Sequence, residues 1–335
     1  MGCKLGGSKL RFCIGLFSIL YAFCAPALAA ETERSGYRLV ANWPAQSVVA
    51  DLGQATGISV DSHNHVFVFH RANREWIEPF PDEPIAAHTV LMLDAETGEA
   101  LASWGGNLMI MPHGLSVDAD DNVWVTDVGG QQVHKFSHDG QLLMSLGTAQ
   151  EAGNDGTHFA QPADVTVDRF GRILVADGYV NTRIAVFTAE GNYLGQWGTH
   201  GDGPSQFDLP HGISLGPNQE VFVADRANSR LQIFGADHEY LDVWAGDHIG
   251  RPYGVDVDAE GVVYVIDGGD QPDNTRATIR MLDMEGRLLG SIDTMRSDDA
   301  AGTVLGHDIS VASDGSIYVV DAWARRIVKY TRAHP

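Results

Sequence analysis

The sequence predicts an all-β protein, a six-bladed β-propeller. A unit of short β-rich segments recurs six times, with a period of about fifty residues, and such internal repeats are typical of propellers. Each complete unit holds four segments, which is the number of strands in a propeller blade. The segments are rich in β-branched and aromatic residues and alternate with period two, as strands packed on one or both faces require.

The first strand of each unit follows a small or polar residue, and a turn with Asp or Gly separates it from a second, more apolar strand. The six first strands lie in Gly57–Asp61, His113–Asp118, Ala163–Asp168, His211–Leu215, Tyr253–Asp258 and His307–Val311. The six second strands are Val66–Phe69, Val123–Thr126, Ile173–Ala176, Val221–Ala224, Val263–Ile266 and Ile317–Val320.

Third and fourth strands complete the inner units. Examples of the third are Gln132–Phe136, Arg183–Phe187 and Arg230–Phe234, and of the fourth Leu142–Gly147 and Tyr193–Gly198. The last unit ends near Tyr330, one strand short. We expect residues 37–43 to supply that strand, close the ring and cover its exposed edge. Residues 30–335 then form a single propeller domain.

The N-terminal residues 1–29 have the pattern of a secretory signal peptide. Lys4, Lys9 and Arg11 precede an apolar run, residues 12–23, and small residues follow at Ala27-Leu28-Ala29. A retained membrane anchor is the alternative, although the run is short for a bilayer span. We expect cleavage, a secreted or periplasmic protein, and no membrane association afterwards.

Charge and cysteine content restrict the possible partners. The formal net charge is −22, so the surface should repel nucleic acid and anionic lipid. All three cysteines, Cys3, Cys13 and Cys24, lie in the signal segment, so the mature chain must be stable without disulfides. We expect a monomer.

The residue that opens each first strand should stand near the mouth of the axial channel. In blade order these residues are Thr56, His113, Ala163, His211, Tyr253 and His307. Histidine therefore occupies every second blade, about 120 degrees apart in a six-fold ring. Three imidazoles in this arrangement leave one side of an ion open, as at a catalytic zinc. The remaining histidines, such as His63, His65, His138, His200 and His248, share no such register and are expected at the surface.

Two arginines and a tyrosine stand shortly after second strands, at equivalent positions of the repeat. Arg71 and Arg226 occupy the same repeat position in blades one and four, and one extra residue in blade three presents Tyr179 there. Arginines supply paired donors for a carboxylate and favour the phenolate form of a nearby tyrosine. The surrounding Asp-x-x-Asn-x-Arg pattern is structural, which accounts for Asn181, Arg183, Asn228 and Arg230 but not for these three residues.

With these residues the chain resembles the peptidyl-α-hydroxyglycine α-amidating lyases, six-bladed propellers with NHL-type repeats, from about Gly57 to Tyr330. The stretches that carry the resemblance are Asp61-Ser62, Phe69-His70-Arg71, Pro112–Ser116, Trp124–Val128, His158–Pro162, Asp177-Gly178-Tyr179, Asp225-Arg226 and His307-Asp308. The resemblance implies zinc at His113, His211 and His307, a catalytic Tyr179, and active-site arginines at Arg71 and Arg226. It also implies a structural calcium held by the Asp308 carboxylate and by backbone carbonyls of Ile58 and Leu115.

Two departures from the family pattern are visible. Positions that form disulfides in animal members carry Val180, Phe222 and Ile233. Leu305-Gly306 precedes His307 where the family has a methionine, which bears on how the substrate fits.

The resemblance implies a zinc-dependent carbon–nitrogen lyase that splits an N-acyl-α-hydroxyglycine, a carbinolamide bearing a carboxylate, into an amide and glyoxylate. Two alternatives remain open, because fold alone does not determine function. One is a non-catalytic propeller that binds a peptide or protein at its mouth. The other is a related lyase or hydrolase acting on a different small carbinolamide, such as a ureido acid.

Overall fold

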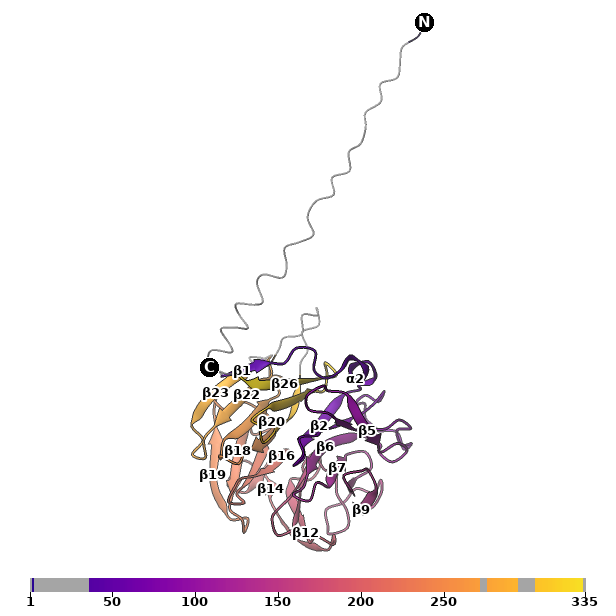
Figure 1. Ribbon diagram of the computed structural model, residues 1–335. Helices are drawn as coiled ribbons and strands as arrows, with labels where there is room; N and C mark the ends of the chain where they lie inside the picture. The colour runs from indigo at the N-terminus through magenta and orange to yellow at the C-terminus, as the bar shows by residue number, and fades with distance from the viewer. Residues whose placement is uncertain (1, 3–35, 272–275, 295–304, 334–335) are drawn as a thin grey trace.

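Six four-stranded antiparallel sheets surround a central axis as the blades of a propeller (Figure 1). The computed structural model describes residues 2, 36–271, 276–294 and 305–333. This arrangement confirms the predicted fold. The predicted signal segment, residues 1–29, lies outside the described residues except for Gly2.

Within each of the first three blades the strands follow one another in chain order from the innermost outward. Blade one contains β2 (Ala55–Val60), β3 (Val66–His70), β4 (Val90–Leu93) and β5 (Ala100–Trp104). Blade two contains β6 (Pro112–Val117), β7 (Val123–Asp127), β8 (Gln132–Phe136) and β9 (Leu142–Leu146). Blade three contains β10 (Asp164–Val167), β11 (Ile173–Asp177), β12 (Arg183–Phe187) and β13 (Tyr193–Trp197).

Blades four and five repeat this order, whereas blade six takes its outer strand from the N-terminus. Blade four contains β16 (Pro210–Leu215), β17 (Val221–Asp225), β18 (Arg230–Phe234) and β19 (Tyr240–Ala245). Blade five contains β20 (Pro252–Val257), β21 (Val263–Asp267), β22 (Thr278–Leu282) and β23 (Leu288–Asp293). Blade six contains β24 (Gly306–Val311), β25 (Ile317–Asp321), β26 (Arg326–Arg332) and β1 (Tyr37–Leu39).

Three short elements lie outside the blades. They are α2 (Gln46–Asp51), β14 (Thr199–His200) and β15 (Gln206–Phe207). In the part of the chain that the structure describes, no helix combines the length and apolar character needed to cross a bilayer.

The ring closes where β1 pairs antiparallel with β26, with Leu39 opposite Tyr330. This strand lies within the predicted 37–43 segment but is shorter. It ends early because Asn42 takes a left-handed backbone conformation, with φ 61°, which turns the chain inward. Trp43 is then buried, and its ring centroid lies 5.1 Å from that of Tyr318 in blade six.

The hydrophobic core is divided among the interfaces between blades. In the described residues, six apolar clusters each join strands of two neighbouring blades. The cluster between blades six and one, for example, contains Trp43, Ile58 and Tyr318. Each second strand is buried along its whole length because both of its faces meet a neighbouring blade.

A buried aspartate at the end of a second strand positions the loop that leads into the same blade's first strand. Asp127 accepts hydrogen bonds from the amides of Ile110 and Met111, at 2.6 and 2.7 Å, just before His113. Asp177 and Asp225 are held in the same way and also pair with the arginines that begin the next strand, Arg183 and Arg230. These arginines are therefore structural, as their repeat positions predict.

Candidate metal centre and active site

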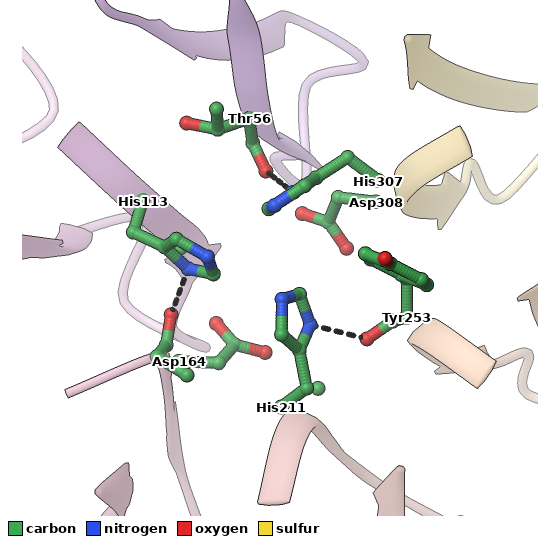
Figure 2. Close-up of a pocket in the computed structure, with 10 residues that line it drawn as sticks. Thr56, His113, Asp164, His211, Tyr253, His307 and Asp308 are labelled. Atoms are coloured by element: carbon green, nitrogen blue, oxygen red, sulfur yellow. Dashed lines mark hydrogen bonds between the residues drawn. The ribbon is translucent and has the colours of Figure 1, made fainter. Parts of the chain in front are cut away.

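The structure brings His113, His211 and His307 together on the axis (Figure 2). Each lies at the start of an innermost strand, in β6, β16 and β24. In all three strands the pairing register shifts at this point, which is the mark of a β-bulge. Bulges turn a side chain away from its regular direction, and here the three imidazoles point toward one another.

A backbone carbonyl of the next blade fixes the tautomer of each histidine. The Nδ1 atoms of His113, His211 and His307 lie 2.7, 2.8 and 2.7 Å from carbonyl oxygens. Those oxygens belong to Ala163, Tyr253 and Thr56. A carbonyl only accepts hydrogen bonds, so each Nδ1 carries the proton and each Nε2 presents a lone pair. This is the usual support for a histidine that binds a metal.

The three rings are buried and close. Their centroids lie 4.6 to 4.9 Å apart, and one nitrogen from each ring lies within 4.8 Å of the others. Burial lowers the pKa of His113 and His211 well below the ordinary value and that of His307 to about 3, with Arg71 adding to the shift at His307. Three neutral imidazoles with converging lone pairs suit a divalent metal such as zinc.

The Tyr179 hydroxyl lies directly against this centre. It is 2.8 Å from Nε2 of His113 and 3.2 Å from Nε2 of His211. Burial raises the pKa of Tyr179, and the charges of Arg226 and Arg71 oppose that rise. The two arginines alone therefore do not produce the phenolate expected from sequence, because the loss of solvent outweighs their attraction.

Arg226 reaches Tyr179 from one side and is itself held by an acidic network. Its Nη1 lies 3.4 Å from the Tyr179 hydroxyl, and its guanidinium carbon lies 3.9 Å from the ring centre of Tyr253. It also donates to the Tyr253 hydroxyl, which in turn donates to Asp270. Arg251 donates to the same carboxylate at 2.7 Å. Asp270 therefore partly neutralises the positive charge of Arg226.

Arg71 approaches from the other side with only neutral partners. Its Nε donates to the Pro112 carbonyl at 3.0 Å and its Nη1 to the Gln54 side-chain oxygen at 2.9 Å. It is buried, and burial lowers its pKa to about 10, which leaves it charged at neutral pH. Among the described residues, no carboxylate forms an ion pair with Arg71.

Trp76 covers the same side of the site. It comes from the long connection between β3 and β4, residues 71–89. Its ring centroid lies 5.0 Å from Tyr179 and 6.1 Å from His113, and the Arg71 guanidinium carbon is 4.9 Å from it. The site therefore combines a cation, a phenol and an aromatic wall.

Asp164 and Asp308 line the axial channel beside the histidines (Figure 2). Asp308 accepts a hydrogen bond from the Ile58 amide at 2.9 Å, and Asp164 accepts one from Ile213 at 3.0 Å. Burial raises the pKa of Asp164 to about 7, and burial together with the charge of Asp164 raises the pKa of Asp308 well above its ordinary value. Two carboxylates that repel each other in a confined channel fit a bound cation, and oxygen ligands suit calcium.

The residues implied for calcium lie on three adjacent inner strands. A side chain on Gly57 would meet Leu115 at 2.7 Å, and one on Gly254 would meet Asp308 at 2.6 Å, so glycine permits this close approach. Asp308, Ile58 and Leu115 thus come from neighbouring blades. The ligand roles of the Ile58 and Leu115 carbonyls stay predictions.

Sequence reasoning missed several residues of this site. Trp76, Gln54 and Asp270 lie in connections that vary between blades, so no repeat register indicates them. The unusual length of the 71–89 connection, with apolar residues inside it, was the available signal. The repeat register did indicate Asp164. It directly follows Ala163, which opens a first strand, just as Asp308 directly follows His307.

Known proteins match this chain over most of its length. An NHL repeat model matches residues 109–136 and 207–234, which contain His113 and His211. A Caenorhabditis elegans protein, the probable peptidyl-alpha-hydroxyglycine alpha-amidating lyase pgal-1, is 33% identical, with 83% of each chain covered. The chain belongs to the peptidyl-α-hydroxyglycine α-amidating lyase family. This confirms the resemblance seen in the sequence, and the chain is a lyase.

The chain also matches a longer relative and a solved structure of similar fold. The Xenopus laevis peptidyl-glycine alpha-amidating monooxygenase B is 35% identical over 87% of this chain. The chain spans about a third of that relative's length, 35%. A gluconolactonase from Xanthomonas campestris has a TM-score of 0.64 at 16% identity, with 91% of this chain and 93% of that chain covered. The likeness to the gluconolactonase shows a shared fold alone.

Proposed function

We propose that this lyase cleaves an N-acyl- or peptidyl-α-hydroxyglycine into an amide and glyoxylate, with zinc at the three histidines. The names of the family relatives support the reaction. The observation that carries it is the Tyr179 hydroxyl, 2.8 Å from His113 Nε2 and 3.4 Å from Arg226 Nη1. A phenol placed between ligand histidines and a cation is a suitable general base.

Zinc fits the three neutral histidines, and when bound it supplies positive charge that polarises the substrate hydroxyl and favours the deprotonated phenol. His113, His211 and His307 would hold it, each in the tautomer that its carbonyl partner imposes. Asp308, with the carbonyls of Ile58 and Leu115, would hold a structural calcium ion.

The two arginines have different surroundings, and we assign them different roles. Arg71 has no carboxylate partner among the described residues, so its charge is available for the substrate carboxylate. Arg226 is held by Tyr253 and Asp270 and lies beside the Tyr179 hydroxyl. Arg226 therefore sets the proton affinity of Tyr179, and Arg71 orients the substrate.

The reaction needs only one proton to move through the site. Tyr179 removes the proton of the α-hydroxyl, and the oxygen lone pair forms the carbonyl of glyoxylate. The carbon–nitrogen bond breaks with its electron pair on nitrogen, which takes up a proton and leaves as the amide. No net proton, electron or water is consumed, as expected of a lyase.

The test is release of glyoxylate from α-hydroxyhippurate and from an α-hydroxyglycine peptide by zinc-loaded protein. We expect turnover in the wild type and a loss of about a hundredfold or more in Tyr179→Phe, which keeps the ring but has no acidic hydroxyl. Full activity in Tyr179→Phe would exclude this mechanism. Activity confined to a ureido acid in a substrate panel would identify a different carbinolamide as the substrate.

A further inference from the structure

Three histidines outside the axial centre gather around one buried carboxylate. His65 Nδ1 and His138 Nε2 each lie 2.8 Å from Oδ2 of Asp61. His63 stands beside them, and one ligand atom from each of Asp61, His63 and His138 lies within 4.8 Å of the others. The ring centroids of the three histidines are 5.4 to 6.0 Å apart.

This cluster is remote from the axial histidines and joins two blades. Asp61 directly follows β2, whereas Thr56, which holds His307, lies at the other end of that strand. Five residues of extended chain separate them, about 16 Å. His63 and His65 lie in the turn between β2 and β3 of blade one, and His138 in the turn between β8 and β9 of blade two.

The same turn in other blades shows what is unusual here. An aspartate occupies this position in blades two, three and five, at Asp118, Asp168 and Asp258. In each, Oδ1 accepts hydrogen bonds from two amides of the turn, as Asp61 Oδ1 does from His63 and His65.

The partners of the second oxygen, Oδ2, differ. They include the Trp124 indole in blade two, the Arg172 guanidinium in blade three and the Tyr264 hydroxyl in blade five. The indole and the guanidinium are donors only, with no lone pair for a metal. In blade one both donors are imidazoles, which can exchange their proton for a metal ion, and His63 adds a third.

We propose that Asp61, His63 and His138 bind a divalent transition-metal ion that links blades one and two. Neutral imidazoles with a carboxylate form a usual ligand set for zinc and for other first-row ions. Three protonated imidazoles this close would repel one another, whereas one dication among neutral rings and a carboxylate is attracted to all of them. This inference does not rest on the proposed reaction.

The carboxylate ligand, Asp61, is held in place, whereas the two histidine ligands can move. The Asp61 side chain is buried and held by two backbone amides, at 2.9 and 2.7 Å. The side chains of His63 and His138 are 66% and 35% exposed, so they can move. Bonds of about 2.0 Å at tetrahedral angles need ligand atoms about 3.3 Å apart. His138 Nε2 and Asp61 Oδ2, now 2.8 Å apart, need only a small shift.

Supporting contacts already orient the rings. Nδ1 of His63 lies 3.1 Å from Oδ2 of Asp121, and the Phe67 ring packs edge-on against His138 at 5.6 Å between centroids. His65 remains a hydrogen-bond partner of Asp61 or a fourth ligand.

The experiment compares bound zinc in the full chain and in His63→Ala, His63→Ala/His138→Ala and the control His200→Ala, which removes an exposed histidine elsewhere. Each protein is dialysed against the same free zinc concentration, and zinc per chain is measured by plasma mass spectrometry. The axial ion is common to all four proteins and cancels in the comparison.

We expect both histidine variants to hold one zinc ion fewer per chain than the wild type and the His200→Ala control. We also expect zinc to raise the unfolding temperature of the wild type more than that of His63→Ala. If the double variant does not fold, the single variant His63→Ala still tests the proposal. The His63 side chain is mostly exposed, so its removal should not prevent folding. Equal zinc content in wild type and His63→Ala would overturn the proposal, whatever the glyoxylate assay shows.

Discussion

His307 Nδ1 lies 2.7 Å from the carbonyl oxygen of Thr56, so the first blade orients the histidine of the last. The same relation joins His113 to Ala163 and His211 to Tyr253. The orientation of each ligand therefore depends on one blade interface, and that of His307 depends on closure of the ring.

Removal of the axial metal should abolish turnover reversibly. Chelation leaves three neutral histidines without the positive charge that polarises the substrate, and added zinc should restore glyoxylate release. His307→Ala should not be rescued, whereas the exposed control His200→Ala should behave as the wild type. Turnover that survives complete metal removal, checked by plasma mass spectrometry, would contradict the zinc proposal.

Substitutions of the two arginines should have different kinetic effects. Arg71→Gln should raise KM about ten- to hundredfold, because a charged hydrogen bond to the substrate carboxylate is lost. Arg226→Gln should chiefly change the pH profile of kcat. Removing a cation raises the pKa of Tyr179, so the rise of activity with pH should move to higher pH.

Arg169→Gln, an exposed change in blade three, is the control for both arginine variants. Steady-state kinetics across pH provides the measurement. Identical effects of Arg71→Gln and Arg226→Gln on KM and on the pH profile would contradict the division of roles.

Trp76 should contribute to recognition of the acyl group. We expect Trp76→Ala to raise KM for α-hydroxyhippurate, which carries a benzoyl group, by about tenfold through loss of an aromatic contact. The acetyl analogue should be little affected. Phe170→Ala, which removes an exposed aromatic side chain of blade three, is the control. Equal effects of Trp76→Ala on the two substrates would assign Trp76 a structural role alone.

Calcium should stabilise the fold through Asp308. We expect calcium to raise the unfolding temperature of the wild type but not of Asp308→Asn, because the amide has no charge to attract the ion. Asp314→Asn, an exposed change in the same blade, should respond like the wild type. Scanning calorimetry at fixed zinc provides the measurement, and an equal calcium response in Asp308→Asn would remove Asp308 from the site.

Acid should destabilise the protein partly through His134. Burial lowers the pKa of His134 to about 4, whereas the unfolded chain takes up its proton near pH 6.5. The folded state then binds fewer protons, so its stability falls as pH drops below 6.5 and levels off below 4. Between pH 7 and 5 the loss should be about 2 kcal/mol.

His134→Gln should show a smaller loss over this range, because glutamine does not titrate. Gln232 occupies the equivalent place in blade four, opposite Val223 as His134 is opposite Val125, so the blade accepts this side chain. Urea unfolding at the two pH values measures the difference. Equal losses in the two proteins would show that His134 does not contribute.

Repeat periodicity was sufficient to predict the blades, because each blade is built from residues close in sequence and alternation records which faces are buried. It also indicated which residue of each blade meets the axis, and so placed His113, His211 and His307 in one register. The electrostatic balance at Tyr179 was not predictable, since burial is set by how Trp76 and its connection fold over the site.

The repeat pattern and the motifs were enough to identify the six-fold repeat, the alternate-blade histidines and the family. Three features became visible only in three dimensions: the tautomers of the axial histidines, the arginine that is paired with a carboxylate, and the meeting of His63, His65 and His138 at Asp61. Each of these depends on contacts between connections of different length or between neighbouring blades. A repeat aligns residues along the chain, but it does not record which side chains of two turns face each other across a blade interface.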